Sequence, residues 1–295
     1  MRVFLLVTLL LAGAPQRPPL VVTQRSADGL LRLLLLRGDG STTLLSRNFA
    51  EAADPDVSWD AKTILFAGRK TAADKWQIYE MPAQGGAARR VVSAPFDCRS
   101  PIYQSTVYVI TADQPWRQIA FVANGALYSS RLDGSDIQKL TYHSAPDSSP
   151  RMLPDGRMVF SSRGGLYAVN ADGTDFAEFS VHEGAADKRN PVVTADGRVV
   201  FDEPDGAAAV SLRRNLHSYS KIARTERVPA GYLQAIELAP RPEPDGSRRR
   251  SPEVTAAPFP GRVTSNRTPS PRLARRPCAT CSSSCRCCFR PPSTH

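Results

Sequence analysis

The chain has 295 residues, of which 41% are hydrophobic and 22% are charged, and its formal net charge is +10. The excess charge is local, because residues 241–295 alone hold eleven Arg and only three acidic residues. The nearly neutral remainder excludes a broadly basic nucleic-acid-binding body. After the N-terminal segment, no run approaches the ~20 apolar residues of a transmembrane helix, so we expect no membrane span.

The first fourteen residues predict export. Residues 1–14, MRVFLLVTLLLAGA, combine one Arg, an apolar stretch and a small-residue ending, which is typical of a secretory signal peptide. Pro15 would hinder cleavage after Ala14, so an uncleaved anchor and a downstream cut remain as alternatives. A buried first strand is a third alternative, because the run is too short to span a bilayer. We expect a secreted or periplasmic protein.

A unit recurs through the middle of the chain. Each copy opens on a Pro and continues into an apolar run, and three copies carry a Tyr, at 79, 128 and 167, five residues before a Gly-containing turn. The copies begin 41 to 49 residues apart, at Pro55, Pro101, Pro150 and Pro191. This period matches one four-stranded propeller blade. The fold class we predict is therefore all-β, a propeller of four-stranded antiparallel blades.

The copy that starts at Pro150 shows the strands most clearly. Asp155-Gly156, Gly164-Gly165 and Asp172-Gly173 separate short runs rich in Val, Phe and Tyr, and such Gly-containing pairs are strong hairpin signals. Residues 31–46 resemble the last two strands of an earlier unit, which raises the total to about five blades. Repeat-equivalent aromatics fill the interfaces between adjacent blades, so we expect that role for Tyr79, Tyr128 and Tyr167.

The motif Pro-x-x-x-Pro-Asp-Gly-Arg at residues 150–157, followed by Leu-Tyr-x-x-Asn-x-Asp-Gly at 166–173, resembles the WD-like repeat of the TolB family of periplasmic β-propellers. Residues 54–81 also resemble the propeller domain of hydrazine synthase α and related secreted multihaem proteins. The resemblance extends from about residue 20 to residue 210. It implies a propeller architecture and says little about activity, because such repeats serve both binding proteins and enzymes.

Two copies depart from the pattern, and the number of blades raises the question of closure. The copy at Pro101 lacks the Asp-Gly turn, and the copy at Pro55 has Trp59-Asp60-Ala61 where Pro-Asp-Gly is expected; we expect these blades to be distorted or to carry insertions. TolB-like propellers usually have six blades, so five leave an open ring. Either degenerate strands within residues 212–239 close it, or the propeller is incomplete. We assign the propeller to residues 20–240.

Residues 241–295 form an Arg-, Pro-, Ser- and Cys-rich tail. It holds ten of the 25 Pro and five of the six Cys, with too little apolar surface to offset chain entropy, so we predict disorder. The abrupt change of composition is also typical of translation in a wrong frame, and this alternative stays open. The cysteines between 278 and 288 could ligate zinc, but no second pair or core would orient them. We predict no metal site; a metal- or polyanion-binding tail is the weaker alternative.

The motifs of common catalytic sites are missing from the sequence. It contains no Gly-x-Ser-x-Gly elbow, no phosphate-binding loop, no Gly-x-Gly-x-x-Gly and no Cys-x-x-Cys-His. We therefore predict no catalytic residue and no cofactor, and a non-catalytic module that binds a protein or a ligand. The alternative is the propeller portion of a larger enzyme, either a multihaem oxidoreductase subunit or a prolyl-oligopeptidase-like peptidase.

Five polar residues are the candidate binding site. His143 and His182 each come just before the first strand of the next blade, and the corresponding loops carry Asp54, Asp147 and Asp187. In a propeller these loops share one face, so we predict a ring of polar groups at the channel mouth that binds a protein or a small polar ligand. The alternative is that these residues only begin strands through Asx-type turns. We expect a monomer that binds no nucleic acid.

Overall fold

The computed structural model describes residues 18–107, 113–179, 186–194, 197–212, 219–223 and 228–244. All of the described residues belong to one compact unit. The predicted signal peptide and nearly all of the predicted disordered tail, including its cysteines, lie outside the described residues. Within the described ranges the chain forms twenty strands and no helix. These residues therefore contain no helix that could span a membrane.

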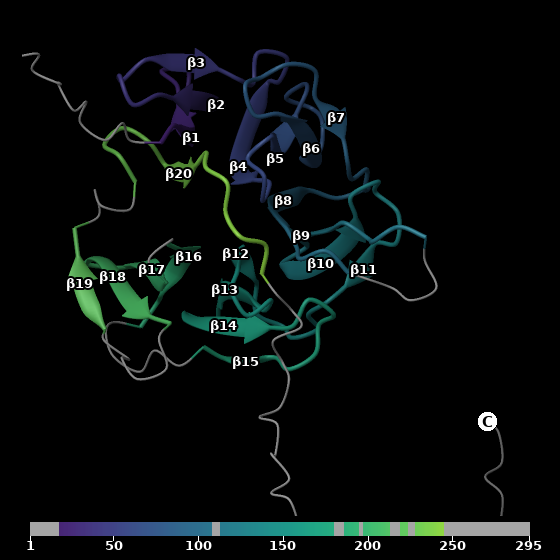
Figure 1. Ribbon diagram of the computed structural model, residues 1–295, viewed down its shortest axis with the longest axis vertical. Coiled ribbons are helices and arrows are strands. Elements are labelled where there is room, and N and C mark those ends of the chain that lie inside the picture. The colour runs from purple at the N-terminus through teal and green to yellow at the C-terminus, as the bar shows by residue number, and fades with distance from the viewer. Residues whose placement is uncertain are drawn as a thin grey trace, which may run out of the picture. The chain divides into compact units, whose positions relative to one another are not determined.

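The strands form five four-stranded antiparallel sheets, the blades of a propeller (Figure 1). In order from the centre outward, blade 1 contains β20 (Gln234–Glu237), β1 (Leu20–Arg25), β2 (Leu31–Leu36) and β3 (Thr42–Leu44). Blade 2 contains β4 (Glu51–Val57), β5 (Thr63–Arg69), β6 (Gln77–Pro82) and β7 (Arg89–Arg90). Blade 3 contains β8 (Cys98–Tyr103), β9 (Gln118–Ala123), β10 (Ala126–Arg131) and β11 (Gln138–Lys139).

Blades 4 and 5 complete the ring. Blade 4 contains β12 (Ser148–Met152), β13 (Met158–Ser162), β14 (Gly165–Val169) and β15 (Ala177–Glu178). Blade 5 contains β16 (Arg189–Val193), β17 (Arg198–Glu203), β18 (Gly206–Ser211) and β19 (Ser220–Ile222). The first strands contact one another in succession, from β20 to β4, β8, β12 and β16, so they surround the centre. The predicted propeller of five blades is confirmed.

A buried Phe occupies one position in the second strand of four blades. Phe66, Phe121, Phe160 and Phe201 are all fully buried. The first three pair across the sheet with Tyr79, Tyr128 and Tyr167 of the third strands. Burying a Phe stabilises the fold by about 1.5–3 kcal/mol, so the repeated aromatic positions of the sequence supply a large part of the core.

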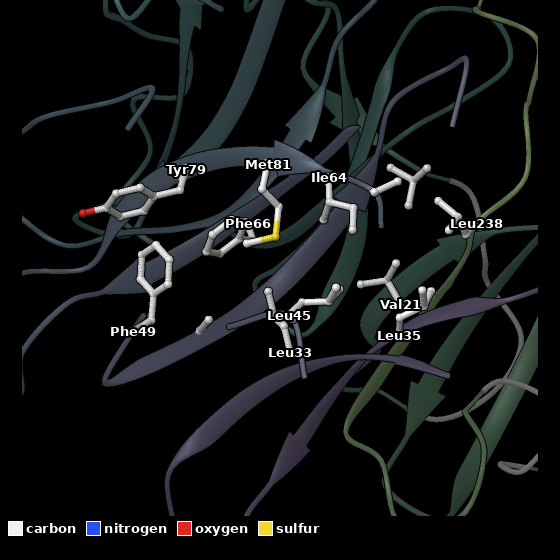
Figure 2. Packing of buried hydrophobic residues seen from close by; sticks show 13 residues of the cluster. Val21, Leu33, Leu35, Leu45, Phe49, Ile64, Phe66, Tyr79, Met81 and Leu238 are labelled. Atoms are coloured by element: carbon white, nitrogen blue, oxygen red, sulfur yellow. The ribbon is translucent and has the colours of Figure 1, made fainter. Parts of the chain in front are cut away.

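Four apolar clusters join neighbouring blades. Figure 2 shows the cluster between blades 1 and 2, in which Val21, Leu33 and Leu35 of blade 1 meet Ile64 and Phe66 of blade 2. Equivalent clusters join blade 2 to 3, blade 3 to 4 and blade 4 to 5. Tyr79 belongs to the first cluster, and Tyr128 and Tyr167 pack against two others, in line with the packing role expected for them.

No comparable cluster of described residues joins blade 5 to blade 1. The end of the propeller returns to its beginning instead, because blade 1 takes its innermost strand from beyond blade 5. All four residues of β20 pair with β1, from Thr23 opposite Gln234 to Leu20 opposite Glu237. Both β19 and β20 come from residues 212–239, so the weakly patterned stretch supplies the closing strands.

The chain beyond β20 continues against blades 2 and 3. The Arg241 guanidinium donates hydrogen bonds to Asp56 Oδ1 at 2.9 Å and to the Val57 carbonyl at 2.7 Å, and it lies 4.5 Å from the centre of the Trp59 ring. The backbone N–H of Thr106 donates to the carboxylate of Glu243. The first residues of the predicted tail, 241–244, are therefore held by the propeller.

The two atypical copies differ from the others in their first hairpins. In blade 3 the connection between β8 and β9 is longer than that between β12 and β13 and contains a bridge between Val107 and Trp116. In blade 2 the turn after β4 has Ala61 in the left-handed region, at φ 57°, whereas Gly156 and Gly197 hold the equivalent turns of blades 4 and 5 at φ 84° and 81°. Left-handed backbone is unfavourable for Ala and free of strain for Gly.

We predict that Ala61→Gly stabilises the protein by about 0.5–1 kcal/mol, because relief of the left-handed strain exceeds the added entropy of the unfolded chain. Gly156→Ala, at the equivalent turn of blade 4, is the matched control and should destabilise by a similar amount. Urea unfolding followed by far-UV circular dichroism measures both changes. Destabilisation by Ala61→Gly would show that the turn gains nothing from Gly.

Candidate binding site at the centre of the propeller

Each of four innermost strands carries a β-bulge at the same position. In blade 2, Asp54 and Pro55 of β4 lie opposite the single residue Phe66 of β5, because the register shifts between Ala53 and Asp56. The same two-to-one arrangement sets Ser100-Pro101, Ser149-Pro150 and Asn190-Pro191 opposite Phe121, Phe160 and Phe201. Proline suits a bulge because the extra residue makes no ladder hydrogen bond. The repeat prolines therefore lie within strands, at bulges, rather than at strand starts.

The residue before each of these prolines has a left-handed backbone. Its φ is 56° at Asp54, 49° at Ser100, 52° at Ser149 and 51° at Asn190. Asp and Asn tolerate this region better than most residues. The four bulges thus place a short polar side chain at the same level of each innermost strand, where it can face the centre of the ring.

A cavity of about 180 Å³ occupies this centre, and residues from all five blades line it. Blade 1 contributes Thr23 and Gln234, blade 2 Asp54, blade 3 Arg99, and blades 4 and 5 Ser149 and Asn190. Leu233, which is 49% exposed, lies at the same cavity and gives it an apolar edge.

Asp54 is the most connected residue of the cavity. Its Oδ2 accepts hydrogen bonds from Arg99 Nε at 2.7 Å and from the Ser100 backbone N–H at 3.0 Å. Its Oδ1 accepts from Gln234 Nε2 at 2.7 Å, and its own N–H donates to Gln234 Oε1 at 2.9 Å. Burial alone would raise the pKa of this carboxyl, but the Arg99 charge and the hydrogen bonds hold the pKa below its usual value.

A second polar chain crosses from blade 4 to blade 5. The Ser149 hydroxyl lies 2.8 Å from Asn190 Oδ1 and donates to it, and Asn190 Nδ2 donates to Asp202 Oδ2 at 2.9 Å. The oxygen and nitrogen of Asn190 are both used within the protein.

The charge of the lining is mainly positive. Arg25, Arg99 and Arg151 contribute three guanidinium groups, and Asp54 is the one carboxylate among the residues that line the cavity. Both oxygens of Asp54 already accept hydrogen bonds from protein groups. A ligand in this cavity therefore meets hydrogen-bond donors, which favours a carboxylate or carbonyl oxygen over a cation.

Among the five residues proposed from the sequence, Asp54 is the one that the structure places at the cavity. His143 and Asp147 lie together elsewhere, Asp187 pairs with Arg189 at the surface, and His182 lies outside the described residues. The structure therefore does not assemble a ring of His and carboxylate groups from the described members of the set. The described ranges also contain no group of three or more potential metal-ligating side chains.

His143 and Asp147 form a buried pair between blades 3 and 4. His143 Nε2 lies 3.0 Å from Asp147 Oδ1, and the His143 ring centre is 4.9 Å from that of Phe176. The Thr141 hydroxyl donates to Asp147 Oδ2 at 2.5 Å and accepts from the Leu127 N–H at 2.9 Å. Burial raises the pKa of the Asp147 carboxyl. These contacts join the end of one blade to the beginning of the next.

The sequence argument overlooked Ser149, Asn190, Gln234 and Arg99. A signal for the first two was present, because both are polar residues directly before a repeat proline, as Asp54 is. Gln234 had no such signal, since β20 lacks the repeat pattern. Cys98, the one cysteine of the propeller body, is buried, and burial raises the pKa of its thiol to about 12, so it is not a reactive group at neutral pH.

We predict that Asp54→Asn costs about 1–3 kcal/mol of unfolding free energy at pH 7, where the carboxylate holds Arg99 and Gln234. Because the folded-state pKa is depressed, this contribution is present above the unfolded-state pKa of about 4 and is lost as the pH falls through the folded-state value. The difference between wild type and variant should therefore shrink in urea unfolding at pH 3. Glu237→Gln, on the exposed side of β20, is the control; an Asp54→Asn effect independent of pH would contradict the assignment.

Comparison with known proteins identifies the architecture. No family model matches the chain. Hydrazine synthase subunit alpha of Kuenenia stuttgartiensis is 40% identical over 60 residues, which are 20% of this chain and 7% of that protein. The solved Kuenenia stuttgartiensis hydrazine synthase has a TM-score of 0.56 at 20% identity, and the match covers 70% of this chain and 39% of that chain.

TolB from Acinetobacter baumannii has a TM-score of 0.53 at 18% identity, and the match covers 70% of this chain and 53% of that chain. The chain thus matches about half or less of the length of these proteins. At 18–20% identity, the similarity to the two solved structures concerns the fold alone. The protein is a five-bladed β-propeller whose structural neighbours include TolB and hydrazine synthase.

Proposed function

We propose that this protein is a secreted or periplasmic binding module that holds a protein segment or a small polar ligand in its central cavity and performs no chemistry of its own. The observation that carries the proposal is the convergence of polar side chains from all five blades on one cavity. Such convergence at the mouth or centre of a closed ring of sheets is typical of a ligand site. The signal-like residues 1–14 and the resemblance to the periplasmic TolB family support the proposed secreted or periplasmic location.

The chemistry of the lining indicates which ligands fit. Three guanidinium groups, those of Arg25, Arg99 and Arg151, line the cavity, whereas the carboxylate of Asp54 is already hydrogen-bonded within the protein. A peptide segment meets this requirement, because its backbone carbonyls and any acidic side chain accept hydrogen bonds. Leu233 adds an apolar contact at the edge. We therefore expect an extended peptide of a partner protein, preferably one with an acidic residue.

A larger side chain at the edge of the cavity should block the ligand and leave the hydrogen-bond network of Asp54 unchanged. Leu233→Trp adds a larger ring at the cavity, and Leu44→Trp makes the same change at an exposed leucine on β3 of the same blade. Peptides selected from a displayed random library against the wild-type protein should bind Leu44→Trp with unchanged affinity. They should bind Leu233→Trp at least tenfold more weakly, as measured by fluorescence polarisation. Failure to select any peptide, or equal affinity for both variants, would contradict the proposal.

One observation favours the second candidate, the propeller portion of a larger enzyme. The 40% identity to hydrazine synthase subunit alpha is high for its length but spans 7% of that protein. The described residues that line the central cavity include no pair of nucleophile and base, so in this case the chemistry would belong to other chains or domains. The propeller would then serve as a docking part.

An antibody against residues 20–240 separates the two candidates in the native organism. For the binding module we expect an immunoblot signal near the 32.1 kDa of this sequence in the periplasmic or secreted fraction. A much larger band, or immunoprecipitated protein that gives a pyridine haemochrome spectrum, would support the enzyme candidate. A band in the cytoplasmic fraction would contradict the proposed secreted or periplasmic location.

A further inference from the structure

A second concave site lies at the rim of blade 2, away from the residues that line the central cavity. Its volume is about 470 Å³, within the range of small-molecule sites. The hairpin between β5 and β6 forms one wall, and β7 with the residues that follow it forms the other.

The β5–β6 hairpin of blade 2 is longer than the equivalent hairpins of blades 3 and 4, the other blades with a repeat Tyr, and it therefore forms a pocket wall that they lack. Seven residues, Lys70 to Trp76, separate β5 from β6, whereas two residues form the equivalent connections of blades 3 and 4. An insertion of this kind at a sheet end is where binding residues commonly occur. Asp74 Oδ2 accepts a hydrogen bond from the Thr71 N–H at 2.8 Å and so fixes the bend of the loop.

The pocket gathers three cations without counterions. Lys70, Lys75 and Arg90 line it together with one acid, Asp74. Within the described part of the chain, neither lysine nor Arg90 takes part in an ion pair. Lys70 Nζ lies 5.7 Å from the centre of the Phe49 ring, which in turn contacts the Tyr79 ring at 4.8 Å. The three cations and Tyr79 therefore line the same pocket.

Tyr79 provides a hydroxyl donor in the same pocket. The residue is 6% exposed, and its ring packs between Phe49 and Phe66, with the hydroxyl directed away from Ile64 and Met81 of the cluster (Figure 2). The hydroxyl makes no hydrogen bond to another described residue, yet Tyr79 lines the pocket. Burial raises the pKa of the phenol, so it is protonated at neutral pH and can donate.

The equivalent positions of the next blades lack this combination. Arg90 lies opposite Tyr79 in the sheet, whereas Lys139 lies opposite Tyr128 and Glu178 opposite Tyr167. The repeat thus keeps the aromatic position and varies the charge beside it, and blade 2 has both the cations and the longer hairpin.

We propose that this pocket binds a small dianionic molecule, with Lys70, Lys75 and Arg90 around the anionic groups and the Tyr79 hydroxyl donating to one of their oxygens. The excess of cations over Asp74 matches a phosphate ester or a dicarboxylate. The volume exceeds that of a free inorganic anion, so an organic body accompanies the charge. The site is independent of the central cavity and of the function proposed for it.

Isothermal titration of the full chain with inorganic phosphate and with succinate tests the proposal and distinguishes the two chemistries. We expect binding by at least one probe at 50 mM NaCl that weakens as the salt is raised, because exposed charges are screened. Arg90→Gln and Lys75→Gln should each raise the Kd about fivefold or more, as expected for the loss of about 1 kcal/mol. Tyr79→Phe keeps the packed ring and should raise the Kd about threefold, for the loss of one hydrogen bond.

Matched controls make the result specific to this pocket. Arg47→Gln removes an exposed arginine elsewhere, and Tyr128→Phe removes the equivalent hydroxyl of blade 3; both should leave the Kd unchanged. Ser149→Ala, in the central cavity, should also leave it unchanged. Absence of binding by both probes at low salt would overturn the proposal. So would equal losses in Arg90→Gln and Arg47→Gln, or loss in Ser149→Ala alone, which would move the anion to the central cavity.

Discussion

The pairing of β20 with β1 is the interaction on which the ring depends. Four blades are each built from one continuous segment, but blade 1 is complete only when residues 234–237 return from the end of the propeller. Apolar clusters join the blades from 1 to 5, and among the described residues none joins blade 5 to blade 1. The hydrogen bonds of β20, extended by Gln234 to Asp54, therefore hold the returning end of the propeller against blades 1 and 2. The residues of β20 in turn line the central cavity.

The β-bulge in the innermost strand of blades 2 to 5 links the aromatic core of each blade to the central cavity. On its outer side it accommodates a fully buried Phe of the second strand, and on its inner side it presents a polar residue in a left-handed backbone. The proline fits because the extra residue of a bulge needs no donor. One short element thus serves packing and recognition together. A change at the Phe would alter the cavity through the bulge as well as the core.

The repeat places side chains at equivalent positions in each blade, but the residue types at some of these positions differ from blade to blade. Tyr79, Tyr128 and Tyr167 share one place in the third strand, yet their partners across the sheet are Arg90, Lys139 and Glu178. The same holds at the bulges, where Asp, Ser and Asn alternate. A propeller can therefore carry distinct sites on a nearly constant frame, here a donor-rich centre and a cationic rim pocket. Their ligands follow from residues that the packing does not constrain.

The repeat and its blades could be predicted from the amino-acid sequence, because Asp-Gly turns, a 41–49-residue period and recurrent Phe and Tyr are local properties. The sequence also marked Asp54, whose position before a repeat proline is visible without a structure. That Gln234 completes the same network is visible in the folded chain alone, since β20 has no sequence pattern that links it to β1. The folded chain also shows that His143 and Asp147 pair within a blade junction rather than at the channel. These outcomes could not be read from local spacing, because the Gln234–Asp54 contact joins residues 180 apart and the orientation of the His143–Asp147 pair depends on how two blades pack.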